Sequence, residues 1–260
     1  EIAAAGGHNI LLKGPPGAGK TMLARSFPSI LPPLTFDEAI EVTKIYSVAG
    51  LLDSNNSLIT IRPFRSPHHS ASYVGLLGGG NTIRPGEISL SHRGVLFLDE
   101  VAEFPRQSLE SLRQPLEDHC ITISRASGSI KLPAQFILFA AQNPCPCGFF
   151  GNPTKNCKCS LNQILKYQRR VSGPMLDRID IHLDVPAVKV EKLHSYDTKN
   201  VENSATIRKR VQKARDIQTK RFSAKGGFKI TSNSEMGNKE IREFCKLDEN
   251  CLKLLQLAVV

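Results

Sequence analysis

One stretch of eight residues constrains this 260-residue chain more than any other feature. Its residues are Gly14, Pro15, Pro16, Gly17, Ala18, Gly19, Lys20 and Thr21. They match the pattern G-x-x-x-x-G-K-[ST], in which glycines let consecutive backbone N–H groups point at phosphate oxygens. An apolar run at 10–12 predicts a buried strand before it, and a short helix is expected after it. We therefore expect a nucleotide here, with Lys20 reaching the β- and γ-phosphates and Thr21 holding Mg²⁺.

Two acidic residues, Asp99 and Glu100, follow directly on the apolar run Val95–Leu98. Four apolar residues in a row indicate a strand buried on both faces, as in a parallel sheet. Ligands of open α/β sheets bind at the carboxyl ends of such strands. We expect Asp99 to hold Mg²⁺ and Glu100 to polarise the water that attacks the phosphate.

Two helices are predicted around these strands. Thr35 and Glu38 form a capping box that predicts a helix over 36–48. Leucines at helical spacing predict a second helix over 106–118, and we expect Pro115 to disturb its last turn.

The segments between and after these helices complete an α/β core. A glycine- and proline-rich part at 51–94 predicts an inserted loop or hairpin, and 121–132 predicts a β-hairpin with a polar tip. Residues 135–141 predict another buried strand, and Asn143 follows it closely enough to touch the γ-phosphate or its water.

The chain divides into three parts by pattern. Residues 1–186 predict an α/β core with a central parallel sheet, 187–203 a linker, and 204–260 part of a small helical domain. The helix expected over 204–222 carries apolar residues on one face, namely Ile207, Val211, Ala214 and Ile217.

The seven cysteines argue for reduced thiols or a metal site, because their number is odd and the chain is no short disulfide scaffold. Four of them lie on one short loop: Cys145, Cys147, Cys157 and Cys159. Four thiolates can close a tetrahedral Zn²⁺ site, but their C-x-C spacing is tighter than usual, so plain reduced thiols remain the alternative. The other three are expected to pack in apolar surroundings: Cys120, Cys245 and Cys251.

Charge is distributed unevenly along the chain, whose formal net charge is +10. Residues 1–186 carry 18 Lys and Arg against 15 Asp and Glu, whereas 187–260 carry 16 against 9. A basic C-terminal part suits a polyanion such as nucleic acid, with a solvated basic surface as the equal alternative. No run of 18 apolar residues or secretory leader is found, so we expect a soluble cytoplasmic protein without a membrane partner.

With these motifs assembled, the chain resembles the AAA+ ATPases, and within them the Mg-chelatase-like family of the ComM/YifB type. The stretches that carry the resemblance are Ala4–Asn9, Arg62–His69, Arg84–Leu90, Leu112–Glu117, Asn143–Gly148 and Ser172–Arg178. The resemblance implies an AAA+ P-loop core with a pre-sensor β-hairpin at 121–132, a helix-2 insert at 57–82 and a C-terminal helical lid. It also implies a longer protein, with a Lon-protease-like domain before Glu1 and the second sensor arginine after Val260.

The resemblance implies a role for each matching residue. Gly14–Thr21 is similar to the Walker A loop, Asp99 to the Walker B magnesium residue, Glu100 to the water-polarising acid and Asn143 to the first sensor. Arg178 matches the arginine finger, which acts on the neighbouring subunit of a ring. Its alternative is an ion pair with Asp177 or Asp180. Arg169 and Arg170 are weaker interface candidates.

The implied function is Mg²⁺-dependent ATP hydrolysis in a ring, expected to be a hexamer, that moves DNA as a helicase or branch-migration motor during recombination of incoming DNA. Arg125 and Lys131 on the hairpin, with the basic lid, are the DNA contacts that the family implies, and a solvated hairpin is the alternative. Two other functions stay open. One is a magnesium-chelatase-type motor that remodels a protein partner. The other is a zinc-stabilised nucleic-acid-binding module that uses ATP as a switch.

Overall fold

The computed structural model describes residues 1–52, 57–80, 83–125, 128–152, 155–187, 202–223 and 230–258, and gives only the backbone for Ser124 and Arg125. The linker predicted at 187–203 falls almost entirely outside these residues. Within them, no helix is long and apolar enough to cross a membrane.

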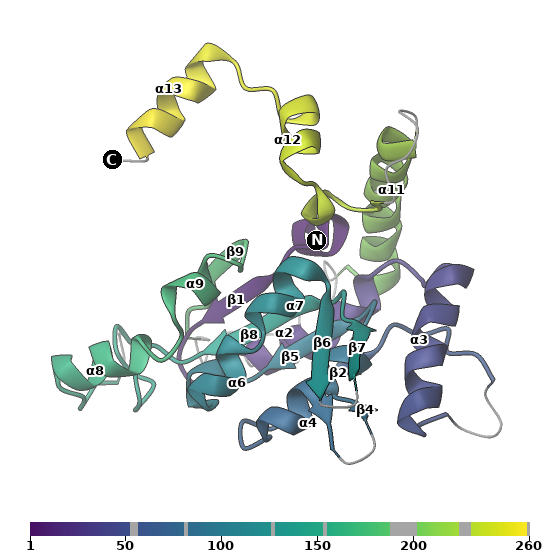
Figure 1. Ribbon diagram of the computed structural model, residues 1–260. Helices are drawn as coiled ribbons and strands as arrows, with labels where there is room; N and C mark the ends of the chain where they lie inside the picture. Colours follow the sequence, from purple (N-terminus) through teal and green to yellow (C-terminus); the bar gives the residue numbers. More distant parts are fainter. Residues whose placement is uncertain are drawn as a thin grey trace.

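A five-stranded sheet forms the centre of the molecule (Figure 1). All its neighbouring strands pair in parallel, in the order β2-β5-β8-β1-β9. The strands are β1 (Ile10–Lys13), β2 (Phe64–Arg65), β5 (Val95–Leu98), β8 (Ile137–Gln142) and β9 (Ile181–Asp184). Because the strands are parallel, the residues that follow β1, β5 and β8 meet at one edge. The predicted α/β fold with a central parallel sheet is confirmed.

The two faces of the sheet bury alternate residues of each strand, as the two-residue period of a strand requires. On one face, Leu96 and Leu98 pack with residues of α5 (Glu87–Leu90), α6 (Arg106–Glu110), α7 (Arg113–Asp118) and α9 (Gly173–Leu176). On the other, Val95 and Phe97 pack in a cluster with residues of α1 (Ile2–Gly6), α2 (Lys20–Ser26), η1 (Phe27–Ile30) and α11 (Ser204–Ser223). All four residues of β5 are buried, as the uninterrupted apolar run predicts.

The predicted helix over 36–48 is α3 (Phe36–Ala49), and both hydrogen bonds of the Thr35–Glu38 capping box form. The predicted helix over 106–118 is instead two short helices, α6 and α7, and the break falls before Arg113 rather than at Pro115. Pro115 lies in the first turn of α7. Backbone N–H groups have no intrahelical partner there, so proline removes no hydrogen bond.

Two small antiparallel ribbons project from the core. The strands β6 (Cys120–Arg125) and β7 (Gly128–Pro133) pair along their whole length and confirm the hairpin predicted at 121–132. In the expected insertion, β3 (Gly78–Gly79) pairs with β4 (Arg84–Pro85), and α4 (Tyr73–Leu77) precedes them.

The C-terminal helices are α11, α12 (Asn238–Phe244) and α13 (Glu249–Ala258), with the short η3 (Asn233–Glu235) after α11. Helix α11 packs on α1 and η1, where Arg215 donates to the carbonyl of Ala4 (3.0 Å) and Gln218 to that of Ala5 (3.0 Å). Helices α12 and α13 extend away from the core (Figure 1).

Two expectations about apolar packing in this part are wrong. Ile217 is 61% exposed, because α11 buries Val211, Gln218 and Phe222 instead. Cys245 and Cys251 are exposed, since the helical segments around them lie away from the core, whereas Cys120 is buried as expected.

Candidate active site

The phosphate-binding loop (residues 14–21) curls between β1 and α2. Gly17 (φ 76°) and Gly19 (φ 86°) adopt left-handed backbone conformations that side chains with a Cβ rarely adopt. Gly14 donates its backbone N–H to the carbonyl of Gln142 at the end of β8 (3.1 Å), which ties the start of the loop to the neighbouring strand. The loop is therefore held in a fixed, curled form at the carboxyl edge of the sheet.

Lys20 is only 8% exposed and lies under the loop. Its Nζ donates to the carbonyls of Gly14 (2.7 Å) and Pro15 (2.9 Å) and to Oδ1 of Asn143 (3.1 Å). Burial lowers the pKa of Lys20, while the charges of Asp99 and Glu100 act in the opposite direction. The ammonium group thus lies among the predicted site residues.

Thr21 and Asp99 meet across the cavity, where the Thr21 hydroxyl donates to Asp99 Oδ2 at 2.7 Å. Glu100 adopts a left-handed conformation (φ 49°, ψ 48°) and donates its N–H to Asp99 Oδ1 (3.0 Å). This backbone form is uncommon for a residue with a Cβ, and such strain concentrates at functional sites. The side chain of Glu100 is exposed and has no hydrogen-bond partner among the described residues.

These residues line one cavity of about 430 Å³, which we call the carboxyl-edge cavity. Its walls include Pro16, Gly17, Ala18, Gly19, Lys20, Thr21, Asp99, Glu100 and Asn143. Gly14 and Pro15 lie behind the wall and hold Lys20 through their carbonyls. None of the described residues beyond Asn143, the C-terminal helices included, lines it.

Helix α8 (Leu161–Gln168) supports Asn143 from behind, and the sequence reasoning missed it. Gln168 Nε2 donates to the carbonyl of Pro144, the residue after Asn143 (3.1 Å), and the buried Tyr167 lies close to the backbone N–H of Asn143. Burial, helped by the charges of Glu103 and Glu100, raises the pKa of Tyr167 to about 12 against the opposing effect of the Asn143 N–H, so the phenol stays neutral. The signal was present, because Ser160 and Gln163 form a second capping box.

Arg178 lies elsewhere, between α9 and β9, and its side chain donates to Glu117 and to the carbonyl of Pro174. The ion-pair partner of Arg178 is thus Glu117, and not Asp177 or Asp180, the alternatives given from the sequence. Arg178 lines a second cavity of about 230 Å³ at the amino ends of the strands, which we call the amino-edge cavity. Arg178 therefore does not line the carboxyl-edge cavity of its own chain.

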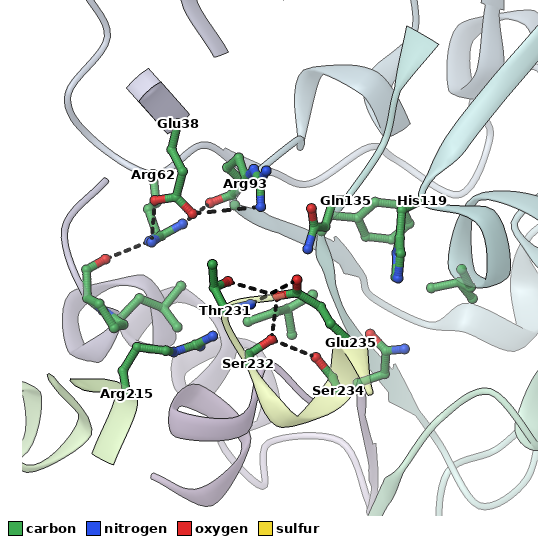
Figure 2. A pocket seen from close by; sticks show the side chains of 18 of the residues that line it. Glu38, Arg62, Arg93, His119, Gln135, Arg215, Thr231, Ser232, Ser234 and Glu235 are labelled. Atoms are coloured by element: carbon green, nitrogen blue, oxygen red, sulfur yellow. Dashed lines mark hydrogen bonds and ion pairs between the residues drawn. The ribbon is translucent and has the colours of Figure 1, made fainter. Parts of the chain in front are cut away.

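The amino-edge cavity is lined by charged groups that pair with one another (Figure 2). On one side, Arg62 donates to the carbonyls of Pro32 (2.6 Å) and Arg93 (2.6 Å) and to Glu38 (3.0 Å). On the other side, the carboxylate of Glu235 accepts from the hydroxyls of Thr231 (2.9 Å) and Ser232 (2.6 Å). The side chain of Arg215 points toward the segment that carries Thr231 and Ser232 (Figure 2).

The four predicted cysteines come together, and the ligand atoms of all four lie within 4.8 Å of one another. The Sγ atoms of Cys145, Cys147 and Cys157 are 3.4, 3.5 and 3.7 Å apart, too far for disulfides. Zinc–sulfur bonds of about 2.3 Å in a tetrahedron place sulfurs about 3.8 Å apart, so the cluster fits Zn²⁺. Backbone N–H groups of Phe149 and Lys158 lower the pKa of Cys147 to about 6. At Cys157 the backbone N–H of Cys159 lowers the pKa, but burial and the neighbouring thiols together raise it to about 12, so the thiols titrate as one group.

The predicted DNA contacts lie on the exposed hairpin. Lys131 in β7 is exposed, while the side chain of Arg125 falls outside the part of the chain that the structure describes. Arg169 is exposed at the end of α8, and Arg170 donates to Glu103 (2.6 Å).

The strand order, with the phosphate-binding loop after β1 and the acidic pair after β5, defines an AAA+ protein of the P-loop class. A family profile described as "Magnesium chelatase, subunit ChlI" matches residues 1–193, and one described as "Magnesium chelatase, subunit ChlI C-terminal" matches residues 201–260. The chain belongs to this Mg-chelatase-like family, which confirms the resemblance seen in the sequence and implies a nucleotide and Mg²⁺.

Curated relatives extend over nearly the whole chain. It is 46% identical over 259 residues to "Competence protein ComM" of Haemophilus influenzae, covering 99% of this chain and 48% of the relative. It is 44% identical over 261 residues to "Uncharacterized protein YifB" of Salmonella typhimurium, covering 100% and 49%. An Escherichia coli protein of the same description is 46% identical over 249 residues, covering 95% and 47%. The chain therefore spans about half the length of the curated relatives it matches.

Proposed function

We propose that this chain is the ATP-hydrolysing core of a ring-forming motor that acts on DNA. The observation that carries the proposal is the convergence of Lys20, Thr21, Asp99, Glu100 and Asn143 on one cavity. These five residues come from the carboxyl ends of three parallel strands. They supply a phosphate-binding cation, two magnesium ligands, a carboxylate and an amide, which are the parts that phosphoryl transfer requires.

Thr21 and Asp99 would hold Mg²⁺. Their oxygens lie 2.7 Å apart, close to the spacing of about 2.9 Å between adjacent ligands of an octahedral Mg²⁺ site. When bound, the ion would neutralise phosphate charge. Glu100 would accept a hydrogen bond from the attacking water, since its exposed carboxylate has no partner among the described residues. Asn143, whose Oδ1 accepts from Lys20 Nζ (3.1 Å), would orient the γ-phosphate or that water.

Arg178 would complete the site of a neighbouring subunit in a hexameric ring. Its position outside the carboxyl-edge cavity of its own chain supports this role, because a finger acting in trans must lie on another surface. Hydrolysis would then depend on assembly.

The cysteine cluster would hold a structural Zn²⁺ with Cys145, Cys147, Cys157 and Cys159 as ligands. Metal analysis of the purified intact protein should find one zinc per chain. Its absence, or its retention after all four cysteines are changed to serine, would end the zinc proposal.

The DNA part rests on the relative named "Competence protein ComM", on the exposed Lys131 hairpin and on the excess of basic residues after residue 186. Its test is the ATPase activity of the intact protein with and without single-stranded DNA, across a salt series. Stimulation should weaken as salt rises, because the DNA affinity falls. The logarithm of the binding constant should decrease against the logarithm of the salt concentration with a slope of about −0.7 per phosphate contact on single strands. Hydrolysis that DNA leaves unchanged at every salt concentration would contradict the DNA motor.

The family description favours one other function, a chelatase-type motor that remodels a protein partner. It would use the same ATP site. Co-purification with a large partner, together with hydrolysis stimulated by that partner and not by DNA, would select it. ATP binding without any hydrolysis by the intact assembly would instead support the third alternative, a zinc-stabilised nucleic-acid-binding module that uses ATP as a switch.

A further inference from the structure

The cysteine loop (residues 145–159) packs directly on the phosphate-binding loop. A Cβ built on Gly148 would lie 2.5 Å from Cδ and 2.6 Å from Cγ of Pro16. Gly148 also has a φ of 82°, in the left-handed region. The contact is therefore closer than any residue with a side chain permits, so a displacement of Gly148 toward Pro16 would move the phosphate-binding loop.

The ends of the same segment reach the other two parts of the candidate active site. Asn143 lies two residues before Cys145. After the cysteine loop, α8 returns so that Gln168 holds the carbonyl of Pro144 (3.1 Å). Just beyond α8, Arg170 donates to the carbonyl of Ala102 (3.2 Å), in the turn that follows Glu100. The segment from 143 to 170 thus carries Asn143 and contacts both the phosphate-binding loop and the turn that follows Glu100.

Besides the cysteines, turn hydrogen bonds hold the described part of this loop, such as that from the Gly148 N–H to the carbonyl of Cys145 (3.0 Å). The Lys155 ammonium also lies over the ring of Phe149. No helix or strand lies between β8 and α8 among the described residues, and Cys145 is fully buried while most of the loop is not. A metal that cross-links thiolates supplies order to a segment that has almost no core of its own.

We propose that Zn²⁺ bound by the four cysteines fixes Gly148 against Pro16 and thereby keeps the phosphate-binding loop in its nucleotide-binding form. Metal occupancy and nucleotide affinity are then coupled, and Gly148 is a positioning residue. The inference rests on the proposed zinc and ATP sites and adds the link between them.

Coupling between two binding sites is reciprocal. If zinc raises the affinity for ATP by some factor, ATP raises the affinity for zinc by the same factor. Coupling between two sites typically changes affinity by about 5- to 150-fold, so a change of about tenfold in ATP affinity is expected when the contact is lost.

The first experiment measures both affinities in the intact protein. A fluorescent ATP analogue is titrated with Mg²⁺ into zinc-loaded protein, into protein stripped by a zinc-selective chelator, and after zinc is returned. Stripping should weaken binding about tenfold and zinc should restore it. In the reverse direction, ATP with Mg²⁺ should raise zinc affinity by the same factor in competition with a chromogenic chelator.

The second experiment uses two matched glycines of the cysteine loop. Gly148→Ala and Gly151→Ala both place a Cβ at a left-handed residue (φ 82° and 75°), but the Cβ at 151 meets no atom within 4 Å. Gly148→Ala should bind zinc, bind ATP about tenfold more weakly and lose the effect of zinc removal. Gly151→Ala should behave as the parent protein in all three measurements.

The outcomes separate the inference from the function on which it rests. Protein that binds both zinc and ATP, with ATP affinity unchanged within twofold by stripping, overturns the coupling alone. Equal effects of the two alanine variants also overturn it. If Gly148→Ala does not fold, the stripping experiment decides. Protein without zinc overturns the zinc site and the coupling together.

Discussion

The cavities at the two ends of the central strands differ in where hydrogen-bonding capacity is left over within the part of the chain that the structure describes. At the carboxyl ends it lies on an exposed carboxylate, that of Glu100, whereas at the amino ends it lies on buried guanidinium nitrogens, Nε of Arg178 and Nε of Arg215. Glu100 has no hydrogen-bond partner among the described residues, while Arg62 donates to three carbonyls and to Glu38. Both cavities are rich in charge and belong to the same sheet. Charge alone does not mark a ligand site; the carboxyl-edge cavity is distinguished by an unpartnered group that is exposed and so accessible to a ligand.

Arg178 tests the comparison of the two cavities most strongly. It lines the amino-edge cavity of its own chain but is proposed to act at the carboxyl-edge cavity of the neighbouring subunit. Arg178→Ala should lower ATP turnover by about 10³ or more, the range measured for arginine fingers. Glu117→Gln is its matched control, because it breaks the same ion pair but keeps the guanidinium of Arg178. Equal losses of stability and activity in the two variants would show that Arg178 only stabilises the fold.

A mixing experiment separates action in trans from action within one chain. In mixed rings, a subunit with Glu100→Gln still offers its Arg178 to the intact Glu100 of an Arg178→Ala neighbour. Activity should therefore reappear on mixing the two inactive variants, and no recovery in rings shown to be mixed would contradict action in trans.

Glu100→Gln should lower turnover by about 10²–10⁴, the usual contribution of a general base. ATP binding should remain, because Glu100 does not touch the phosphate-binding loop through any described hydrogen bond. Steady-state hydrolysis and a binding titration on the same preparation measure both. Unchanged turnover would remove Glu100 from the mechanism.

Arg62→Ala should have the opposite profile. Its partners Glu38 and the carbonyls of Pro32 and Arg93 are left with fewer donors in a largely buried position. The free energy of unfolding should fall by about 3 kcal/mol. ATP affinity, measured below the unfolding transition, should stay within twofold. A large loss of affinity without a loss of stability would make the amino-edge cavity a ligand site.

His92, at the amino side of the sheet, should give an effect on stability that is at most as large and that depends on pH. Burial and the charge of Arg93 lower the pKa of His92 to about 4, although Glu41 opposes the shift. The unfolded chain therefore binds more protons between about pH 6.5 and 4, and the free energy of unfolding should fall by up to about 3 kcal/mol as pH decreases through this window. In His92→Asn, whose side chain can still accept from the N–H of Gln135, this part of the pH dependence should disappear. If the variant keeps the same pH profile, the loss of stability between about pH 6.5 and 4 comes from other groups and not from His92.

The parts predicted correctly from sequence are those encoded by contiguous residues. The glycine loop, the buried run before Asp99 and the Thr35 capping box each carry their signal within eight residues, and each forms as expected. The parts missed depend on contacts between distant segments. The approach of Gly148 to Pro16 joins residues 132 positions apart, and the exposed side of α11 is set by α1 and η1, which no periodicity within α11 reveals.

Binding of ATP at the carboxyl-edge cavity is tested most directly by titrating a fluorescent ATP analogue with Mg²⁺ into the intact protein and into its Lys20→Ala variant. Lys20 is the buried cation that joins the phosphate-binding loop to Asn143. The parent protein should bind one nucleotide per chain, and the variant should bind at least about a hundredfold more weakly, since it loses a buried charge-assisted contact. Equal affinities in two folded proteins would contradict this account.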